Sequence, residues 1–270
     1  MESKNKVFLE TTIQITRRSG DLERKEKIEK FIIQYQKRIT SSYVKMEFKR
    51  RYIGDLVYLF NLISDADNFC DVYDKLKILP PVQHRRISGI LGSFGHFFLD
   101  IKDNKTTQSI GDYLLEAGYI FFKNAIELSW QDFDKNIDNI LDETDCLNAK
   151  SGPVLKKARF YNQLSCKQNG KVCKMKEFVL KNREFLKKIY DKLSHIENLD
   201  DEQKKTKGIV EGALKYPQNM ANYKNCSSCG DVIISLECPE DTEIFTTNTK
   251  HFSPICEAIG KIVVSGELGN

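Results

Sequence analysis

The chain has 270 residues, enough for one large domain, or for a domain carrying an insertion, with a core that needs no disulfide bonds. Its 40% hydrophobic and 30% charged residues are typical of a globular protein. The most apolar long window, Ile110–Trp130, contains four charged side chains, which argues against a membrane span and a membrane partner. No apolar segment follows Met1, so a secretory signal is not expected. Together with eight cysteines, this predicts a reducing, cytoplasmic location.

The charge is unevenly distributed, although its net value is only +4. Residues Lys150–Leu193 contain thirteen Lys or Arg against three Asp or Glu, whereas Glu127–Asp145 contain seven acids against one lysine. Such a basic lobe is expected of a protein that binds a polyanion such as nucleic acid, although a solvated lysine-rich face has the same pattern. The candidate nucleic-acid contacts are Lys156, Lys157, Arg159, Lys171 and Lys174.

The first part of the chain alternates between strand and helix signals. The pattern predicts, in order, a strand at Lys6–Glu10 running into helix-capping Thr11 and Thr12, a helix at Leu22–Gln36, a short strand over 38–42 and a long helix at Tyr43–Ile63. A strand–helix–strand–helix order predicts a parallel sheet built from βαβ units.

The middle of the chain has helical periodicity and few strand signals. Between Asp67 and Asp200, Pro80 and Pro81 mark a break, and the predicted helices are His84–Leu99, Gln108–Leu128, Trp130–Leu141 and Phe178–Leu193. The range 66–200 is therefore predicted to be a mainly α-helical insertion. Residues 1–65 and 201–270 are predicted to form one discontinuous α/β domain, whose central sheet takes strands from both chain ends.

Strand signals return near the C-terminus. The segment DVIISLE, Asp231–Glu237, fits a strand and a buried helix equally well by periodicity. A strand at Glu243–Thr247 follows, and Ser253 and Pro254 begin a final helix that runs through Ile259. Because both ends of the chain have α/β character, we expect an active site to form where they meet.

Three acids lie at element boundaries in these α/β segments. Glu10 is the last residue of the first predicted strand. Glu47 lies in the first turns of the helix that follows the second strand, and Asp231 is the first residue of DVIISLE. Ligands bind beyond the carboxyl ends of parallel strands, so the three carboxylates are expected to converge. Close carboxylates repel each other unless a hard cation such as Mg²⁺ or Mn²⁺ neutralises them, and such ions activate water against phosphodiesters. If DVIISLE is a helix, backbone N–H groups at its start are expected to keep Asp231 ionised.

In this order, the motifs VFLETT, SSYVKMEFKR, CGDVIISLE and FTTNTKHF resemble those of the PIN-domain nucleases. The resemblance covers about residues 1–60 and 205–265 and implies a three-layer PIN-like domain in which DVIISLE is a helix. It also implies a metal-dependent nuclease, with RNA as the expected substrate. The residues that carry over are Glu10, Asp231 and Asn248 as Mg²⁺ or Mn²⁺ ligands, Glu47 orienting a water or a second ion, Thr246 supporting Asn248, and Phe252 packing beneath the strand end.

Two departures from the family pattern predict weak metal binding. Glu10 stands where the family usually has Asp, and Asn248 is neutral. The alternative function is therefore a catalytically degenerate nucleic-acid-binding or scaffold protein. Taken singly, Glu47 could only favour its helix N-terminus, Asp231 could only cap a helix, and Asn248 could only be a turn residue. A protein inhibitor or a second copy of the chain are further candidate partners.

The segment CKQNGKVC, Cys166–Cys173, is predicted to form a hairpin, because Asn-Gly is the strongest two-residue turn signal. Counting outward from the turn pairs Gln168 with Lys171 and brings the two cysteines opposite each other. They could share Zn²⁺ with Cys146, or with the Cys226 and Cys229 pair, which would make the chain a zinc-stabilised interaction module. Free buried thiols are the alternative. His251 follows Asn248 by three residues and could contact a scissile phosphate, or only pack.

Overall fold

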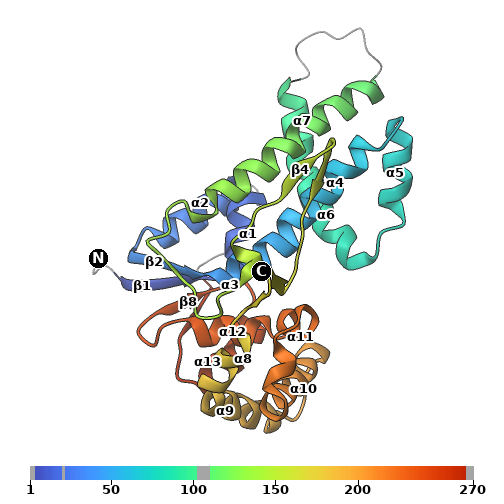
Figure 1. The fold of residues 1–270 in the computed structure, drawn as a ribbon. Helices are drawn as coiled ribbons and strands as arrows, with labels where there is room; N and C mark the ends of the chain where they lie inside the picture. The colour runs from blue at the N-terminus through green and yellow to red at the C-terminus, as the bar shows by residue number, and fades with distance from the viewer. Residues whose placement is uncertain (1–3, 20–21, 102–109, 266–270) are drawn as a thin grey trace.

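The computed structural model describes residues 4–19, 22–101 and 110–265. Its centre is a five-stranded sheet in the order β3-β2-β1-β8-β9, in which every neighbouring pair is parallel. The strands are β1 (Lys4–Leu9), β2 (Tyr35–Ser41), β3 (Asn139–Leu141), β8 (Glu243–Phe245) and β9 (Val263–Val264). The predicted parallel sheet with strands from both chain ends is therefore confirmed (Figure 1).

Helices cover both faces of this sheet and give three layers. Successive side chains of a strand point to opposite faces, and in β1 Val7 and Leu9 pack in one core cluster while Phe8 packs in another. The first cluster includes side chains of α1 (Thr11–Ser19) and α2 (Leu22–Ile32). The second includes side chains of α3 (Ser42–Phe48), α12 (Gly230–Glu237) and α13 (Thr249–Ala258). DVIISLE is thus a helix.

The long helix predicted at Tyr43–Ile63 is present and has a π-helical section. It consists of α3, the π-helical turn Lys49–Ile53 and α4 (Gly54–Ser64). The Ser41 hydroxyl caps it by accepting a hydrogen bond from the Val44 N–H at 3.2 Å. π-Helical turns are frequent at functional sites, and this one begins two residues after Glu47.

The prediction of a helix at Trp130–Leu141 is wrong. Helix α7 (Ile110–Gln131) continues through Trp130, a 3₁₀ turn follows at Asp132–Asp134, and the chain then enters β3. The physical reason is long-range pairing with β2: the Asp138 N–H donates to the Arg38 carbonyl at 2.8 Å, and the Asp138 carboxylate accepts from the Arg38 N–H at 2.7 Å. The sheet thus takes an edge strand from the range assigned to the helical insertion, and the division into two domains stays a prediction.

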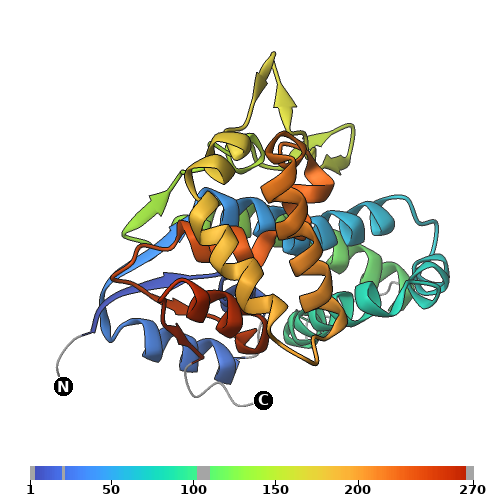
Figure 2. The ribbon, with the colours of Figure 1, turned by 90° about the horizontal axis from the view of Figure 1, so that it is seen from below.

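The other helices form two groups around the sheet domain. Helices α5 (Phe69–Lys77) and α6 (Pro81–Ile101) lie with α7 beside α4 at the top right of Figure 1. The segment predicted as one helix at Phe178–Leu193 is divided into α8 (Met175–Lys181) and α9 (Arg183–Ser194), which lie below the sheet with α10 (Asp201–Lys215) and α11 (Tyr223–Ser228) (Figures 1 and 2). None of the helices in the described ranges has the length and apolar character needed to cross a membrane.

Two short hairpins project from the region between β3 and α8. They are β4 (Val154–Lys156) with β5 (Arg159–Tyr161), and β6 (Lys167–Gln168) with β7 (Lys171–Val172). The second hairpin has the predicted register, with Gln168 opposite Lys171. Its turn residues Asn169 and Gly170 have φ of 51° and 77°, the left-handed conformation that an Asn-Gly turn requires.

Glu237 is a buried acid at the end of α12. Its raised pKa leads us to expect that the stability of the protein falls as the pH rises. Burial raises the pKa of its carboxyl from the ordinary 4.5 to about 8, although the Ser41 and Thr144 hydroxyls are near enough to oppose the shift. Among the described residues, neither hydroxyl reaches full hydrogen-bond geometry with it. Because the folded protein keeps a proton that the unfolded chain releases, the free energy of unfolding should fall between pH 4.5 and about 8. The loss at pH 7 is on the order of 3 kcal/mol.

Glu237→Gln should remove the part of this pH dependence that Glu237 contributes and raise the melting temperature at neutral pH. Thermal melting from about pH 5 to about pH 9 measures it, with the exposed Glu197→Gln as the control. A native protein whose stability stays level across this range would show that Glu237 ionises as freely in the fold as in the unfolded chain.

Candidate active site

Glu10 lies directly after β1, and the first turn of α1 fixes its carboxylate. One carboxylate oxygen accepts a hydrogen bond from the Thr12 N–H at 2.8 Å, and the other accepts one from the Thr12 hydroxyl. The residue is only 2% exposed. Burial raises the pKa of this carboxyl, while hydrogen bonds from Thr12 and Thr246 act against the shift.

Glu47 is held at both carboxylate oxygens. On α3, its Oε2 accepts from the Thr11 hydroxyl at 2.8 Å, and its Oε1 accepts from the Arg50 guanidinium at 2.9 Å. Gly230 lets the start of α12 approach this carboxylate, because a Cβ at that position would lie 2.8 Å from Glu47 Oε1. The glycine of the CGD motif is therefore needed for close packing between two helices from opposite ends of the chain.

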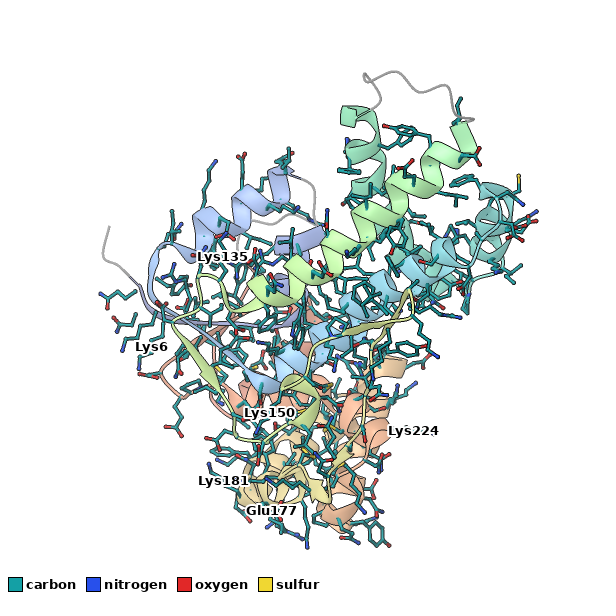
Figure 3. All side chains as sticks on the ribbon, turned by 45° about the horizontal axis from the view of Figure 1, so that its top comes forward. Lys6, Lys135, Lys150, Glu177, Lys181 and Lys224 are labelled. Carbon is teal, nitrogen blue, oxygen red and sulfur yellow. The ribbon has the colours of Figure 1, made fainter. Side chains whose placement is uncertain are left out.

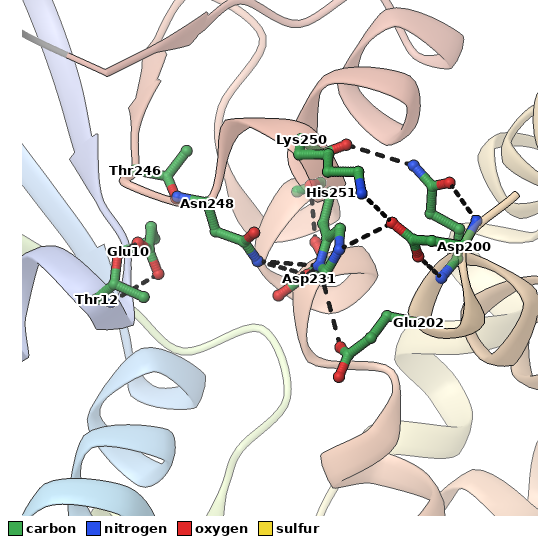
Figure 4. Close-up of polar contacts among 11 residues, drawn as sticks. Glu10, Thr12, Asp200, Glu202, Asp231, Thr246, Asn248, Lys250 and His251 are labelled. Carbon is green, nitrogen blue, oxygen red and sulfur yellow. Dashed lines mark hydrogen bonds and ion pairs between the residues drawn. The ribbon is translucent and has the colours of Figure 1, made fainter. Parts of the chain in front are cut away.

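Asp231 and Asn248 contact each other across the pocket. The Asn248 side-chain amide donates to Asp231 Oδ2 at 3.4 Å, and the Asn248 N–H donates to the Thr246 hydroxyl at 2.8 Å (Figure 4). Thr246 therefore supports Asn248 as predicted, and Phe252 is buried in the core below. In this orientation Asn248 presents its amide nitrogen to Asp231, so ligation of a cation by its oxygen requires the amide to turn over.

The acids influence one another electrostatically. The pKa of Asp231 is raised to about 7, first by desolvation and then by the charges of Glu47 and Glu10, while Arg51 acts against the shift. The expectation that helix N–H groups keep Asp231 ionised is thus wrong for the protein without a bound cation. The reason is that burial and two nearby carboxylates outweigh the short helix α12.

A pocket of about 320 Å³ opens at this point, lined by three carboxylates and three cationic side chains, and we call it the acidic pocket after its carboxylates. Its lining includes Glu47, Arg50, Arg51, Glu202, Lys205, Asp231, Asn248 and His251. The structure thus brings three of the four predicted residues to one cavity, while Glu10 lies outside its lining. Glu10 still lies close enough to influence the pKa of Asp231.

Sequence reasoning missed the part of the pocket that α10 contributes. His251 has its Nδ1 3.3 Å from the Asn248 amide nitrogen and its Nε2 3.5 Å from Asp200, the residue that caps α10 (Figure 4). The hydrogen bond from Lys250, and the one from the Gln203 N–H, lower the pKa of Asp200 to about 2. The available signal was the capping box at Asp200–Gln203, which begins a helix that presents Glu202 and Lys205 on one face.

The oxygen-rich donor set of the acidic pocket fits a hard cation such as Mg²⁺ or Mn²⁺. Such an ion would relieve the repulsion that raises the pKa of Asp231. As the side chains stand, no group of three or more His, Cys, Asp or Glu residues in the described ranges is arranged to hold a metal ion. Binding therefore requires the carboxylates, Glu10 above all, to turn from their present hydrogen bonds.

The basic groove is a second cavity, of about 760 Å³, near the two hairpins. Its lining residues are Ser151, Gly152, Val154, Lys156, Lys157, Tyr161, Gln163, Ser165, Lys167, Gln168 and Asn169. Of the predicted nucleic-acid contacts, Lys156 and Lys157 line it. The other three lie outside it: Arg159 pairs with Asp65 at 3.0 Å, Lys174 pairs with Asp145 at 3.6 Å, and Lys171 is exposed on β7. Figure 3 shows Lys150 and Lys181, other members of the basic lobe, on the lower part of the molecule.

Lys49 connects the basic groove to the helix that carries Glu47. It is fully buried, and its ammonium donates to the carbonyls of Gln163 at 3.0 Å and Asn148 at 3.3 Å and to the Ser151 hydroxyl at 3.4 Å. Gln163 and Ser151 line the groove. Residues two apart on a helix point to different faces, so Lys49 holds the wall of the groove on a different side of this helix from Glu47 and the acidic pocket.

The predicted zinc ligands also come together. Cys146, Cys166 and Cys173 line one small cavity with Cys226, whereas Cys229 lines the acidic pocket. The structure therefore separates the two members of the Cys226 and Cys229 pair.

Comparisons of this chain with known proteins found no similar protein. No family model, no curated protein and no solved structure matches it.

Proposed function

We propose that this protein is a metal-dependent nuclease that hydrolyses phosphodiester bonds of RNA, in which Glu10, Asp231 and Asn248 hold the cation and Glu47 orients a water or a second ion. The observation that carries the proposal is that Glu47 and Asp231, from opposite ends of the chain, line one pocket, with Glu10 just outside its lining. The three carboxylates are close enough that Glu47 and Glu10 raise the pKa of Asp231. A PIN-like identity for the fold belongs to the same proposal, and the three layers and the all-parallel sheet are compatible with it.

The pocket residues have separate roles in this proposal. A bound Mg²⁺ or Mn²⁺ would supply Lewis-acid chemistry and lower the pKa of a bound water. Glu47, held by Thr11 and Arg50, orients the attacking water. Arg51 and Lys205 offer positive charge to phosphate oxygens at the pocket wall. The basic groove binds the phosphate backbone of the nucleic acid and gives no sequence specificity.

A catalytically degenerate nucleic-acid-binding protein is the second candidate, and two observations favour it. Both Glu10 carboxylate oxygens are engaged by Thr12, outside the lining of the acidic pocket. The Asn248 amide nitrogen, rather than its oxygen, faces Asp231.

A single assay separates the two functions. Labelled single-stranded RNA and DNA of the same sequence are incubated with the full chain while Mn²⁺ or Mg²⁺ is titrated, and binding and cleavage are followed together. The nuclease proposal expects cleavage that requires the metal and is faster on RNA. Binding to RNA without cleavage at any metal concentration would favour the second candidate, and an absence of both would reject each of them.

Gly230→Ala should reduce cleavage by about 10-fold to 100-fold, because its Cβ would displace a carboxylate that Thr11 and Arg50 hold in place. The new atom would lie 2.8 Å from Glu47 Oε1, whose displacement breaks its hydrogen bond with Arg50. The matched control is Gly212→Ala in α10, where nothing lies within 4 Å of the added Cβ. Cleavage rates and Mn²⁺ affinity are measured for both variants, and unchanged rates for Gly230→Ala would mean that the position of Glu47 does not matter.

A further inference from the structure

Four cysteines from three separate segments converge on one enclosed cavity. Cys146 precedes the 3₁₀ turn Leu147–Ala149, Cys166 and Cys173 flank the β6–β7 hairpin, and Cys226 lies in α11. All four line the same cavity of about 10 Å³. This volume is about one water-sized sphere, so the cavity excludes an organic ligand and leaves room for a single small species.

The hairpin explains how two of the sulfur atoms meet. The pairing of Lys167 with Val172 is the outermost in the β6–β7 ladder. The next residues outward are Cys166 and Cys173, which therefore emerge side by side from the two strands. Cβ atoms of directly opposite residues lie about 4.5–5.5 Å apart, which is close enough for both thiols to reach a shared ion.

The other two sulfur atoms lie within electrostatic range of this pair. Burial raises the pKa of Cys146 to about 12, with smaller contributions from Cys173 and Cys166, while N–H groups of the following turn point at its sulfur. Burial likewise raises the pKa of Cys226, and Cys146, Cys173 and Cys166 add to it. Each cysteine is therefore adjacent to the others in space as well as at the cavity wall.

We propose that Cys146, Cys166, Cys173 and Cys226 form a closed, four-thiolate structural Zn²⁺ site. Four cysteines with no open position are a standard donor set for structural zinc. All four are free cysteines in the structure. As they stand they do not form a metal-holding group, so zinc binding turns the thiols inward toward their shared cavity and releases their protons.

The proposed zinc would tie the hairpin region to the helices beside the acidic pocket. The Cys226 carbonyl accepts a hydrogen bond from the Tyr43 hydroxyl at 2.8 Å, and Tyr43 lies on α3 with Glu47. Four residues after Cys226 the chain reaches Gly230, at the start of α12. The metal thus has a structural role, distinct from the cation proposed at the carboxylates, and the inference holds whether or not the protein is a nuclease.

Metal analysis of the purified full chain tests the site. We expect one zinc per chain by elemental analysis, and loss of most of it in Cys226→Ala and in Cys173→Ala. Cys229→Ala is the matched control, because this buried cysteine of the same segment lines the acidic pocket instead, and it should keep its zinc. Loss of zinc from Cys229→Ala but not from Cys226→Ala would overturn the ligand assignment.

A measurement on the unmodified protein covers the case in which these variants fail to fold. Replacing the metal with Co²⁺ should give the visible absorption of tetrahedral cobalt and the near-ultraviolet charge-transfer bands of thiolate ligands. Asp231→Asn should leave this spectrum unchanged, which separates the site from the acidic pocket. Three outcomes would contradict the proposal. The purified protein could contain no zinc and take up no Co²⁺, or it could contain iron instead. Mass spectrometry could also show a disulfide between Cys166 and Cys173.

Discussion

Asp231→Asn should reduce the rate of Mg²⁺- or Mn²⁺-dependent cleavage by about 100-fold or more, without unfolding the protein. The substitution keeps the shape of the side chain but removes one negative charge from a cation site in which Asn248 is already neutral. The side chain makes no cap hydrogen bond to α12, so no cap is lost. It is 33% exposed, so solvent moderates its repulsion with Glu47 and Glu10, and the gain in stability from relieving that repulsion is at most about 1 kcal/mol.

The measurement is paired: thermal melting, and cleavage of labelled single-stranded RNA with metal titrated. Asp201→Asn is the control, because it removes the same charge from a fully exposed side chain on α10 that is not part of the pocket lining. Full activity in folded Asp231→Asn would show that this carboxylate is not a metal ligand. Equal losses in the two variants would assign the effect to net charge.

Reversing Lys156, Lys157 and Arg159 to Glu should weaken nucleic-acid binding at least about tenfold at low salt. Lys156 and Lys157 line the basic groove, and Arg159 is exposed on the same hairpin. Each lost phosphate contact reduces the slope of log K against log salt by about 0.7 for a single strand. A decrease of about 2 is therefore expected if all three residues contact phosphate, and salt titration of RNA binding measures it.

The control for this variant reverses three other lysines of the basic lobe. Lys187, Lys188 and Lys192 are exposed on α9, away from the groove lining. Two of them form ion pairs, as Arg159 does. If the α9 variant loses as much affinity as the hairpin variant, the lobe acts only through its total charge. If the hairpin variant keeps its salt slope, these three residues do not contact the backbone.

Local patterns predicted the elements that carry the candidate site. Glu10 and Glu47 each follow a strand of the α/β pattern, and the structure has both at those places. DVIISLE was ambiguous by periodicity and is a helix, because it packs on the sheet face that carries Phe8. The helix expected at Trp130–Leu141 failed for a related reason. Strand β3 exists through hydrogen bonds to β2, about a hundred residues earlier in the chain, and no local pattern records such a partner.

The sequence by itself determined which chemical groups this protein can use: carboxylates at the ends of strands and helices, a basic lobe, and an Asn-Gly hairpin between two cysteines. Those features depend on spacing along the chain, which local propensity and turn chemistry control. Only the tertiary structure decided which groups meet. Cys226 lines the small cavity shared with Cys146, Cys166 and Cys173, whereas Cys229 lines the acidic pocket, although the two residues are only three apart in the chain. The tertiary structure also placed Asp231, partly shielded from solvent, beside Glu47, so that its pKa is raised to about 7. Burial and the distances between residues remote in sequence are set by packing, because desolvation and repulsion depend on neighbours that only the folded chain brings together.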